Sequence, residues 1–434
     1  MQGDGRLPAP RGNRRYRVFV AVFACVAVTA VTAVLALTVL VDPFGMIGLV
    51  EIEGFNASKP HMFSNARLVK AHYIGRVKPR GLILGSSRAD VGLDADYAGW
   101  PPTARPVFNA SIPSARIQEI YYYLRYAHAQ SGLKRIVIGL DFFAFDERIK
   151  AEPGFDVARL DPDGFGPWRI ATIRDQFTAF LSYGAVSASI STLRSQDQYA
   201  VRYLPNGGQD PRRREWNISQ KGGHHAAFLA SLRETVTSRD GVAMLAYGPS
   251  DENRNVELGW FLELLRFCKH EGIDVYLLIS PAHALWLESI WELGAWADYE
   301  RWKRDLVRIV DRVTHEAPGA PVIELWDFSG FNAITTEPVP PRDASGARMR
   351  WYWDASHYKA ATGDLMLTRA FGGGQPDPAL QASAFGIWLT PENIDKHLQA
   401  IRSDRIRYVA SHPEDLLMIR TVLDDAPERI PRRQ

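Results

Sequence analysis

The sequence predicts a three-layer α/β fold with a parallel sheet, preceded by one transmembrane helix. Apolar runs of strand length alternate with amphipathic stretches of helix length through most of the chain. Such alternation predicts a parallel sheet covered by helices on both faces. Near the N-terminus, residues 18–41 form a run of 24 residues without a charge, glycine or proline, which is typical of a membrane-spanning helix.

The apolar run at 18–41 is long enough to cross a bilayer. A helix of this length spans about 36 Å, and the hydrocarbon core is about 30 Å thick. The alternative is a cleaved secretory signal, whose apolar core is shorter, roughly 7–15 residues. Val41-Asp42-Pro43-Phe44 is also a poor cleavage site, so we expect an uncleaved signal-anchor. Five arginines against one Asp4 precede the run, which predicts a cytoplasmic N-terminus and an exported remainder.

The composition is that of a globular protein. The chain has 434 residues, 46% of them hydrophobic and 23% charged, which is enough for one large domain or two. A net charge of +2 offers no concentrated basic face, so we expect no nucleic-acid partner. Cys25 lies in the apolar run and Cys268 in the exported part, so we expect no disulfide.

The elements follow a simple order along the chain. After a basic tail (1–17), the apolar helix (18–41) and a connector (42–80), we expect one main domain at 81–375 and a helical extension at 376–434. Strands are expected at 81–85, 105–111, 135–143, 273–280 and 321–328. Helices are expected at 114–130, 255–270, 285–315 and 390–407. The run at 135–143 is almost entirely apolar, as in a strand buried on both faces. Residues 146–250 are less periodic and are interpreted as an insertion with some helix.

Polar residues follow several of the predicted strands, where sites form in open α/β sheets. These stretches are Ser86-Ser87-Arg88, Asn109-Ala110-Ser111, Asp141-Phe142-Phe143 and Ser280-Pro281-Ala282-His283. Far downstream, Asp354 precedes His357 by three residues, which on a helical turn puts both side chains on one face. If Ser87 and His357 meet, with Asp354 behind the imidazole, they form a nucleophilic serine site. The alternative is that the serine turn and Asp354 only cap helices and His357 is a surface residue.

These blocks resemble a known family. Gly85-Ser86-Ser87 is similar to the nucleophile block of SGNH (GDSL-type) hydrolases, and Asp354-x-x-His357 is similar to their C-terminal block, in the same chain order. Asn109-Ala110-Ser111-Ile112 resembles the second block, with Ser114 at the usual glycine. Gly139-Leu140-Asp141 falls at the third block, where the family normally has Gly-x-Asn-Asp. The four blocks extend roughly from residue 80 to residue 360.

The resemblance implies roles for individual residues. Ser87 would be the nucleophile, His357 the general base and then acid, and Asp354 the residue that orients His357. The backbone N–H groups of Ser87 and Ser114 would bind the oxyanion, with Asp141, Arg88 and Asn109 as secondary candidates. An ionised Asp141 cannot donate the amide hydrogen bond of the family's asparagine, and losing one such donor typically costs about a hundredfold in rate. This chemistry needs no cofactor or metal.

The layout is also similar to that of the teichoic-acid D-alanyl transfer protein and of alginate O-acetylation proteins. This similarity implies an SGNH-like O-acyltransferase or esterase anchored in the bacterial inner membrane, with its C-terminal domain in the periplasm. The expected substrate is an exported glycan or acyl ester, and the expected partner is an integral-membrane protein that exports acyl groups. The alternatives are a non-catalytic SGNH-like scaffold and a structural subunit of a membrane-associated complex.

Overall fold

The structure is a computed structural model that divides the chain into two compact units. It describes residues 13–48, 50–146, 148, 152, 154–162, 170–196, 201–236, 247–316, 319, 321–372 and 385–425. One unit comprises Met1–Met62 with Gly166–Gln198, and the other comprises Phe63–Phe165 with Tyr199–Gln434. Residues 1–12 of the expected tail, and 376–384 and 426–434 of the expected C-terminal extension, lie outside the described residues. The insertion expected at 146–250 contributes residues to both units.

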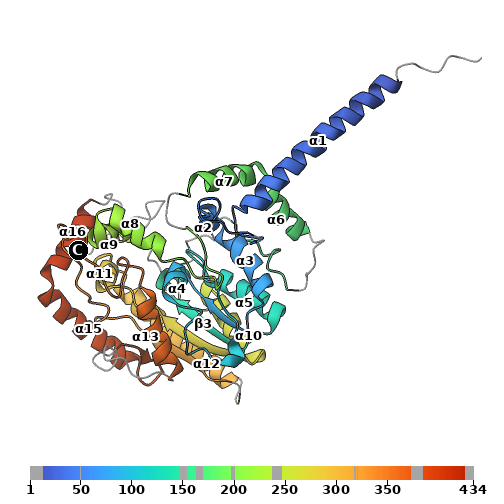
Figure 1. Ribbon diagram of the computed structural model, residues 1–434. Helices are drawn as coiled ribbons and strands as arrows, with labels where there is room; N and C mark the ends of the chain where they lie inside the picture. Colours follow the sequence, from blue (N-terminus) through green and yellow to red (C-terminus); the bar gives the residue numbers. More distant parts are fainter. Residues whose placement is uncertain are drawn as a thin grey trace, which may run out of the picture. The chain divides into compact units, whose positions relative to one another are not determined.

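The larger unit is built on a six-stranded sheet, which confirms the predicted α/β class (Figure 1). The strand order is β2-β1-β3-β4-β5-β6. The strands are β1 (Gly81–Leu84), β2 (Val107–Asn109), β3 (Arg135–Leu140), β4 (Asp274–Ile279), β5 (Ile323–Asp327) and β6 (Ile387–Trp388). The first five are parallel, whereas β6 pairs antiparallel with β5. The apolar side chains of β1 and β3 are fully buried, as expected for central parallel strands.

The strand order places a natural binding crevice beside β1. The chain moves from β1 to β2 on one side and then returns across β1 to β3, so its direction reverses between β1 and β3. In open α/β sheets, sites form outside the carboxyl ends of the strands at such a reversal. Ser87 follows β1 and Asp141 follows β3, so both lie at this point.

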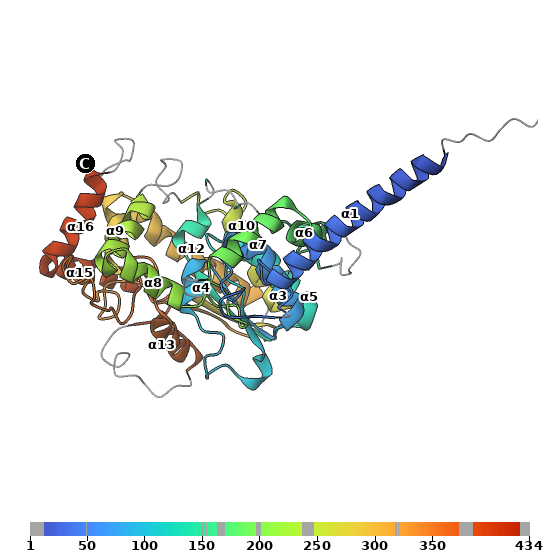
Figure 2. The ribbon, with the colours of Figure 1, turned by 45° about the horizontal axis from the view of Figure 1, so that its top comes forward.

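Helices cover the sheet on both faces (Figures 1 and 2). Since parallel crossovers are right-handed, the reversal of direction puts α4, after β1, on the face opposite to α5, α10 and α12. Consistent with this, α5 packs on α10 and α10 on α12, while α4 packs on α13. These helices are α4 (Ser87–Gly92), α5 (Ile117–Ser131), α10 (Val256–His270), α12 (Trp296–Glu316) and α13 (Ala360–Phe371). The others in this unit are α3 (Ala66–Val77), α8 (Arg212–Gln220), α9 (Gly223–Val236), α11 (Ala284–Glu292), α15 (Ile394–Ser411) and α16 (Pro413–Asp424), and the short α2 (His61–Ser64) lies at the unit boundary.

Several elements differ from the sequence prediction. The single helix expected at 285–315 is wrong, because the chain breaks between α11 and α12 at Gly294, whose φ of +74° is left-handed. The helix expected from residue 114 begins only at Ile117, since Ser114 has a φ of +55°. The range expected as a connector contains α3. Strand β6 was not predicted, because a two-residue strand carries too little periodicity, whereas α16 falls within the helical extension expected at 376–434.

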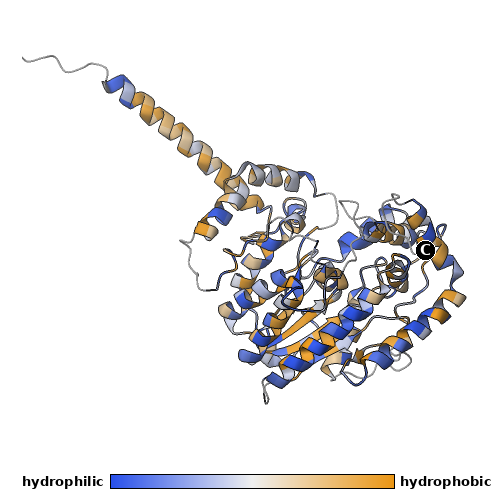
Figure 3. Cartoon of the chain, turned by 180° about the vertical axis from the view of Figure 1, so that it is seen from behind, coloured by the Kyte–Doolittle hydropathy of each residue, from blue (hydrophilic) through white to orange (hydrophobic). Residues whose placement is uncertain are grey.

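The smaller unit contains the apolar helix α1 (Asn13–Val41) with α6 (Ile170–Phe180) and α7 (Tyr183–Arg194). The end of α1 contacts α6, where Thr38 Oγ1 donates a hydrogen bond to the Phe180 carbonyl at 2.9 Å. Figure 3 shows α1 as apolar along most of its length. Within the described residues, Arg14–Val41 is the one helix long and apolar enough to cross a membrane, with a mean hydropathy of 2.7. Its orientation stays a prediction.

Candidate active site

The two serines in the turn after β1, Ser86 and Ser87, have different roles. Ser86 caps α4, because its Oγ accepts the Arg88 backbone N–H at 3.1 Å. Ser87 is the first residue of α4, and its side chain is left free of capping. Gly85 makes the turn possible: its φ is +146°, and a Cβ there would lie 2.8 Å from the Ala89 Cβ.

The Asp354 and His357 side chains lie on a tight loop rather than on the helical turn expected from their spacing. An antiparallel bridge between Tyr352 and Tyr358 closes the loop. Inside it, Asp354 Oδ1 accepts the backbone N–H groups of Ser356 and His357, both at 2.9 Å. These two bonds fold the carboxylate back onto its own loop, as short polar side chains do in turns. The side chains of Asp354 and His357 therefore meet without a helix.

Ser87, His357 and Asp354 form a continuous hydrogen-bonded chain. The Ser87 Oγ lies 2.9 Å from the His357 Nε2. The His357 Nδ1 lies 2.9 Å from Asp354 Oδ1 and 3.0 Å from Oδ2. Since an ionised carboxylate only accepts, Nδ1 carries the proton and Nε2 is free to accept the hydrogen of Ser87. The three residues have the separations required of a nucleophile, a base and an orienting acid.

The surroundings of Asp354 favour its ionised form. Burial alone would raise the pKa of Asp354, but His357, the backbone hydrogen bonds and Arg214 outweigh it, so the pKa lies well below its ordinary value. Arg214, on α8, places its Nη1 3.3 Å from Asp354 Oδ2. A fixed negative charge beside Nδ1 stabilises the imidazolium that forms when His357 takes a proton.

Asp141 is held in a buried network with Ser86 and Arg88. Its Oδ2 accepts a hydrogen bond from the Ser86 Oγ at 2.5 Å, and its Oδ1 pairs with the Arg88 Nη1 at 2.9 Å. The Arg88 Nε donates a hydrogen bond to the Ser356 Oγ at 3.1 Å. Ser356 lies between Asp354 and His357 in the chain. Arg88 thus connects the serine turn, the end of β3 and the 354–357 loop. Its positive charge compensates the negative charge of the Asp141 carboxylate.

The backbone N–H groups of Ser87 and Ser114 remain candidates for binding an oxyanion. Neither takes part in a hydrogen bond with the described residues. Ser114 has a φ of +55°, a left-handed conformation that is uncommon outside glycine and is often found at functional sites. Asn109 does not line the cavity beside Ser87 and Ser114. Its amide donates hydrogen bonds to the carbonyls of Ala89 and Leu93, so it holds β2 against α4.

Glycines let α4 and α13 pack closely and fix the serine turn relative to the histidine loop. A Cβ at Gly92 would lie 2.0 Å from the Tyr358 ring, and one at Gly363 would lie 1.7 Å from the Gly92 carbonyl. Tyr358 directly follows His357 in the chain. The close contact therefore seats the histidine loop on the helix that begins with Ser87.

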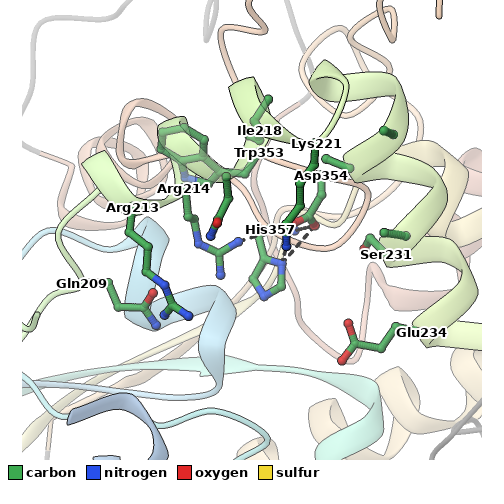
Figure 4. A pocket seen from close by; sticks show the side chains of 14 residues that line it. Gln209, Arg213, Arg214, Ile218, Lys221, Ser231, Glu234, Trp353, Asp354 and His357 are labelled. Atoms are coloured by element: carbon green, nitrogen blue, oxygen red, sulfur yellow. Dashed lines mark hydrogen bonds and ion pairs between the residues drawn. The ribbon is translucent and has the colours of Figure 1, made fainter. Parts of the chain in front are cut away.

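Two cavities border His357. The smaller, about 80 Å³, is lined by Ser87, Ser114, Arg88, Phe143, Trp286 and His357, among others. The larger, about 440 Å³, lies mainly between α8 and α9 and reaches Asp354 and His357 (Figure 4). Sequence reasoning missed Arg214 and this helical pair. The one available signal was the spacing of Arg213, Asn217 and Lys221, four residues apart on one helical face.

Among the described residues, no group of three or more His, Cys, Asp or Glu side chains is arranged to hold a metal ion. Cys25 and Cys268 are both free. A scan against models of protein families finds no match for this chain, and a search of curated proteins finds no similar sequence.

Proposed function

We propose that the chain is a serine-dependent acyltransferase or esterase of the SGNH-like type. One observation carries this proposal: the Ser87 Oγ lies 2.9 Å from the His357 Nε2, while Asp354 binds the other imidazole nitrogen. These residues lie 270 positions apart in the sequence and on separate turns. A structural role for either side chain alone gives no reason for this arrangement.

The geometry supports a two-step reaction. Ser87 Oγ attacks the ester carbonyl carbon while His357 Nε2 takes the hydroxyl proton. His357 then gives this proton to the departing alkoxide, which leaves as an alcohol, and an acyl-serine remains. In the second step His357 deprotonates water or an acceptor hydroxyl, which attacks the acyl-serine. The products are a carboxylic acid or a new ester, and Ser87 regains its proton from His357.

The oxyanion of each step would be bound by the backbone N–H groups of Ser87 and Ser114. Arg88 and Asp141 would serve as positioning residues, because their hydrogen bonds go to Ser86, Ser356 and each other. A non-catalytic scaffold is less well supported, because the negative charge of Asp141 is paired with Arg88. The backbone donors that the reaction needs are unoccupied.

The smaller cavity favours a short acyl group. Its volume of about 80 Å³ is much smaller than that of the second cavity. The rings of Phe143 and Trp286 border it. An acetyl group fits this space. With an anchoring helix at 14–41, the proposed setting is the periplasmic side of a bacterial inner membrane, where an integral-membrane partner supplies acyl groups for an exported glycan.

A fluorophosphonate probe tests the nucleophile directly. The full-length protein in detergent should be labelled and should release nitrophenol from p-nitrophenyl acetate, and Ser87→Ala should abolish both. Ser403→Ala, at an exposed serine of α15, is the matched control and should behave as the parent. An unlabelled parent protein, or labelling that persists in Ser87→Ala, would contradict the proposal.

A further inference from the structure

The larger cavity is formed by a helical pair outside the sheet. Arg213 and Asn217 of α8 and Lys221 directly after it line the cavity, as do Ala226, Ala230 and Glu234 of α9. Spacings of four and eight residues put each set on one face of its helix. The cavity also reaches Asp354 and His357, so a molecule held there lies beside the general base. Its volume of about 440 Å³ is in the range of small-molecule sites.

The cavity carries positive charge that the protein itself does not neutralise. Arg214 pairs with Asp354, but Arg213 and Lys221 have no carboxylate partner among the described residues. The Arg213 guanidinium instead lies over the Phe63 ring, with its carbon 4.4 Å from the ring centroid. Burial, followed by the charge of Arg214, lowers the pKa of Arg213. Two half-buried arginines side by side repel each other, and a bound anion would relieve this repulsion.

Two carboxylates line the cavity: Asp354 pairs with Arg214, and Glu234 lies on the other side of His357 from Arg213. Figure 4 shows Arg213 and Gln209 on one side of the His357 ring and Glu234 on the other. Glu234 has no ion-pair partner among the described side chains and borders both cavities. An anionic ligand is therefore attracted toward Arg213 and repelled from Glu234. This asymmetry gives a bound molecule one preferred orientation.

The wall beside Arg213 is rigid. The Gln209 Nε2 donates to Asp90 Oδ2 at 2.6 Å, and the buried Lys70 Nζ pairs with Asp90 Oδ1 at 2.8 Å. Asp90 belongs to α4, the helix that begins with Ser87. These hydrogen bonds hold Gln209, a lining residue near Arg213, at a fixed place relative to the helix that carries Ser87. A site held in this way favours a ligand of defined length.

Part of the remaining cavity lining is apolar. Ala226, Ala227 and Ala230 leave a shallow wall on α9, and Trp353 adds an aromatic surface. Sugar rings have apolar faces that pack on such surfaces, and their hydroxyls and acidic groups lie at the ring edges. The combination fits a sugar unit that carries a carboxylate or a phosphate group.

We infer that the larger cavity binds the alcohol side of the ester, the acyl acceptor, as an anionic sugar unit. Its carboxylate or phosphate contacts Arg213 and Lys221, and one of its hydroxyls points to the His357 Nε2. The inference rests on the proposed function for the role of the hydroxyl. The binding of the anionic sugar does not depend on Ser87 and can be measured without turnover.

The test uses the full-length Ser87→Ala protein in detergent and isothermal titration with glucuronate, glucose 6-phosphate and glucose. At least one of the two anionic sugars should bind at least tenfold more tightly than glucose, and which of them does tells carboxylate from phosphate. Adding Arg213→Gln should remove about tenfold of this affinity, the typical contribution of a charge-assisted hydrogen bond. Lys221→Gln, at an exposed residue whose change does not threaten folding, should act in the same direction.

Arg254→Gln, at an exposed arginine outside the cavity lining, is the matched control and should leave binding unchanged. Equal binding of all three sugars, no binding of either anionic sugar, or anionic binding indifferent to both Arg213→Gln and Lys221→Gln would overturn the inference. Probe labelling separates this failure from that of the proposed function. If the probe labels Ser87 but the protein does not prefer anionic sugars over glucose, only the inference is overturned. If the protein prefers anionic sugars but the probe does not label it, the proposed function is overturned and a glycan-binding site remains.

Discussion

Two histidines near the carboxyl edge of the same sheet show how surroundings decide what an imidazole does. His357 has Asp354 on one nitrogen and Ser87 on the other, and it borders both cavities. His283 is fully buried, accepts the Leu285 backbone N–H at Nδ1 and donates from Nε2 to the Glu337 carbonyl. Both nitrogens of His283 are bound to backbone, so it has none left for a reaction.

The two histidines differ mainly in the charge of their hydrogen-bond partners, because His357 contacts a carboxylate and His283 contacts only backbone groups. Burial lowers the pKa of His283 to about 4, and the bond to Glu337 offsets only part of this effect, so the ring stays neutral. The His357 Nδ1 instead lies 2.9 Å from a carboxylate oxygen of Asp354. The two are also connected, since the His283 backbone N–H donates to the Ala355 carbonyl at 3.1 Å. The neutral His283 therefore supports the loop that carries His357.

The largest effect should come from exchanging each histidine for alanine. His357→Ala should lower kcat for a short ester by about 10⁴-fold or more while leaving the melting temperature unchanged, because its ring is part of the reacting chain. His283→Ala should do the opposite: it leaves a buried N–H and a buried carbonyl unpaired, which costs about 2–4 kcal/mol of stability. Initial rates and thermal unfolding of the two proteins check this. If His357→Ala and His283→Ala lost similar amounts of stability, the proposed difference between the two histidines would be wrong.

Asp354→Asn should lower kcat nearly as far, by about 10⁴-fold. An amide NH₂ can donate to the imidazole, which then carries its proton on Nε2 and cannot accept from Ser87. Single-turnover rates with an acetyl ester measure the effect. Asp210→Asn, whose carboxylate pairs with Arg212 away from the triad, is the control. A loss below tenfold in Asp354→Asn would mean that Asp354 does not orient His357.

The buried histidine should make folding sensitive to acid. Its pKa is about 4 in the folded chain and about 6.5 when unfolded, so between these values the unfolded chain binds more protons. This contribution to stability is complete above about pH 6.5 and is lost as the pH falls toward 4, at roughly 1.4 kcal/mol per pH unit and about 3 kcal/mol in total. Urea unfolding of the parent and of His283→Gln at several pH values measures it. Equal pH slopes in the two proteins would assign the acid sensitivity to other groups.

The smallest effect is expected at Arg214, which supports His357 only through Asp354. Arg214→Met removes one of several contacts to Asp354 and should lower kcat by about tenfold with little change in KM, since the backbone N–H groups still hold the carboxylate. Arg212→Met on the same helix is the control. Steady-state rates separate the two parameters. A higher KM with unchanged kcat would make Arg214 a substrate contact instead.

The sheet and the serine and histidine blocks were accessible from the sequence, because each depends on a local pattern. Buried strands appear in the sequence as continuous apolar runs. Ser87 and His357 each belong to a short motif that can be recognised without knowing the other. The compensation of Asp141 was not accessible. Arg88 and Ser86 reach it from a neighbouring strand end, and no spacing in the chain indicates that contact. The pairing of α8 with α9 was also hidden, because it depends on two surface helices meeting across a short turn.

The side chains around the larger cavity come mainly from α8 and α9, whereas Ser87, Asp354 and His357 lie on turns at the sheet edge. The walls of the larger cavity and the hydrogen-bonded chain of Ser87, His357 and Asp354 are thus encoded mainly in separate stretches of the gene. Arg214 belongs to this hairpin and contacts Asp354, so a different hairpin between residues 211 and 236 would have to keep Arg214 in order to change the cavity walls and leave the hydrogen bonds among Ser87, His357 and Asp354 in place.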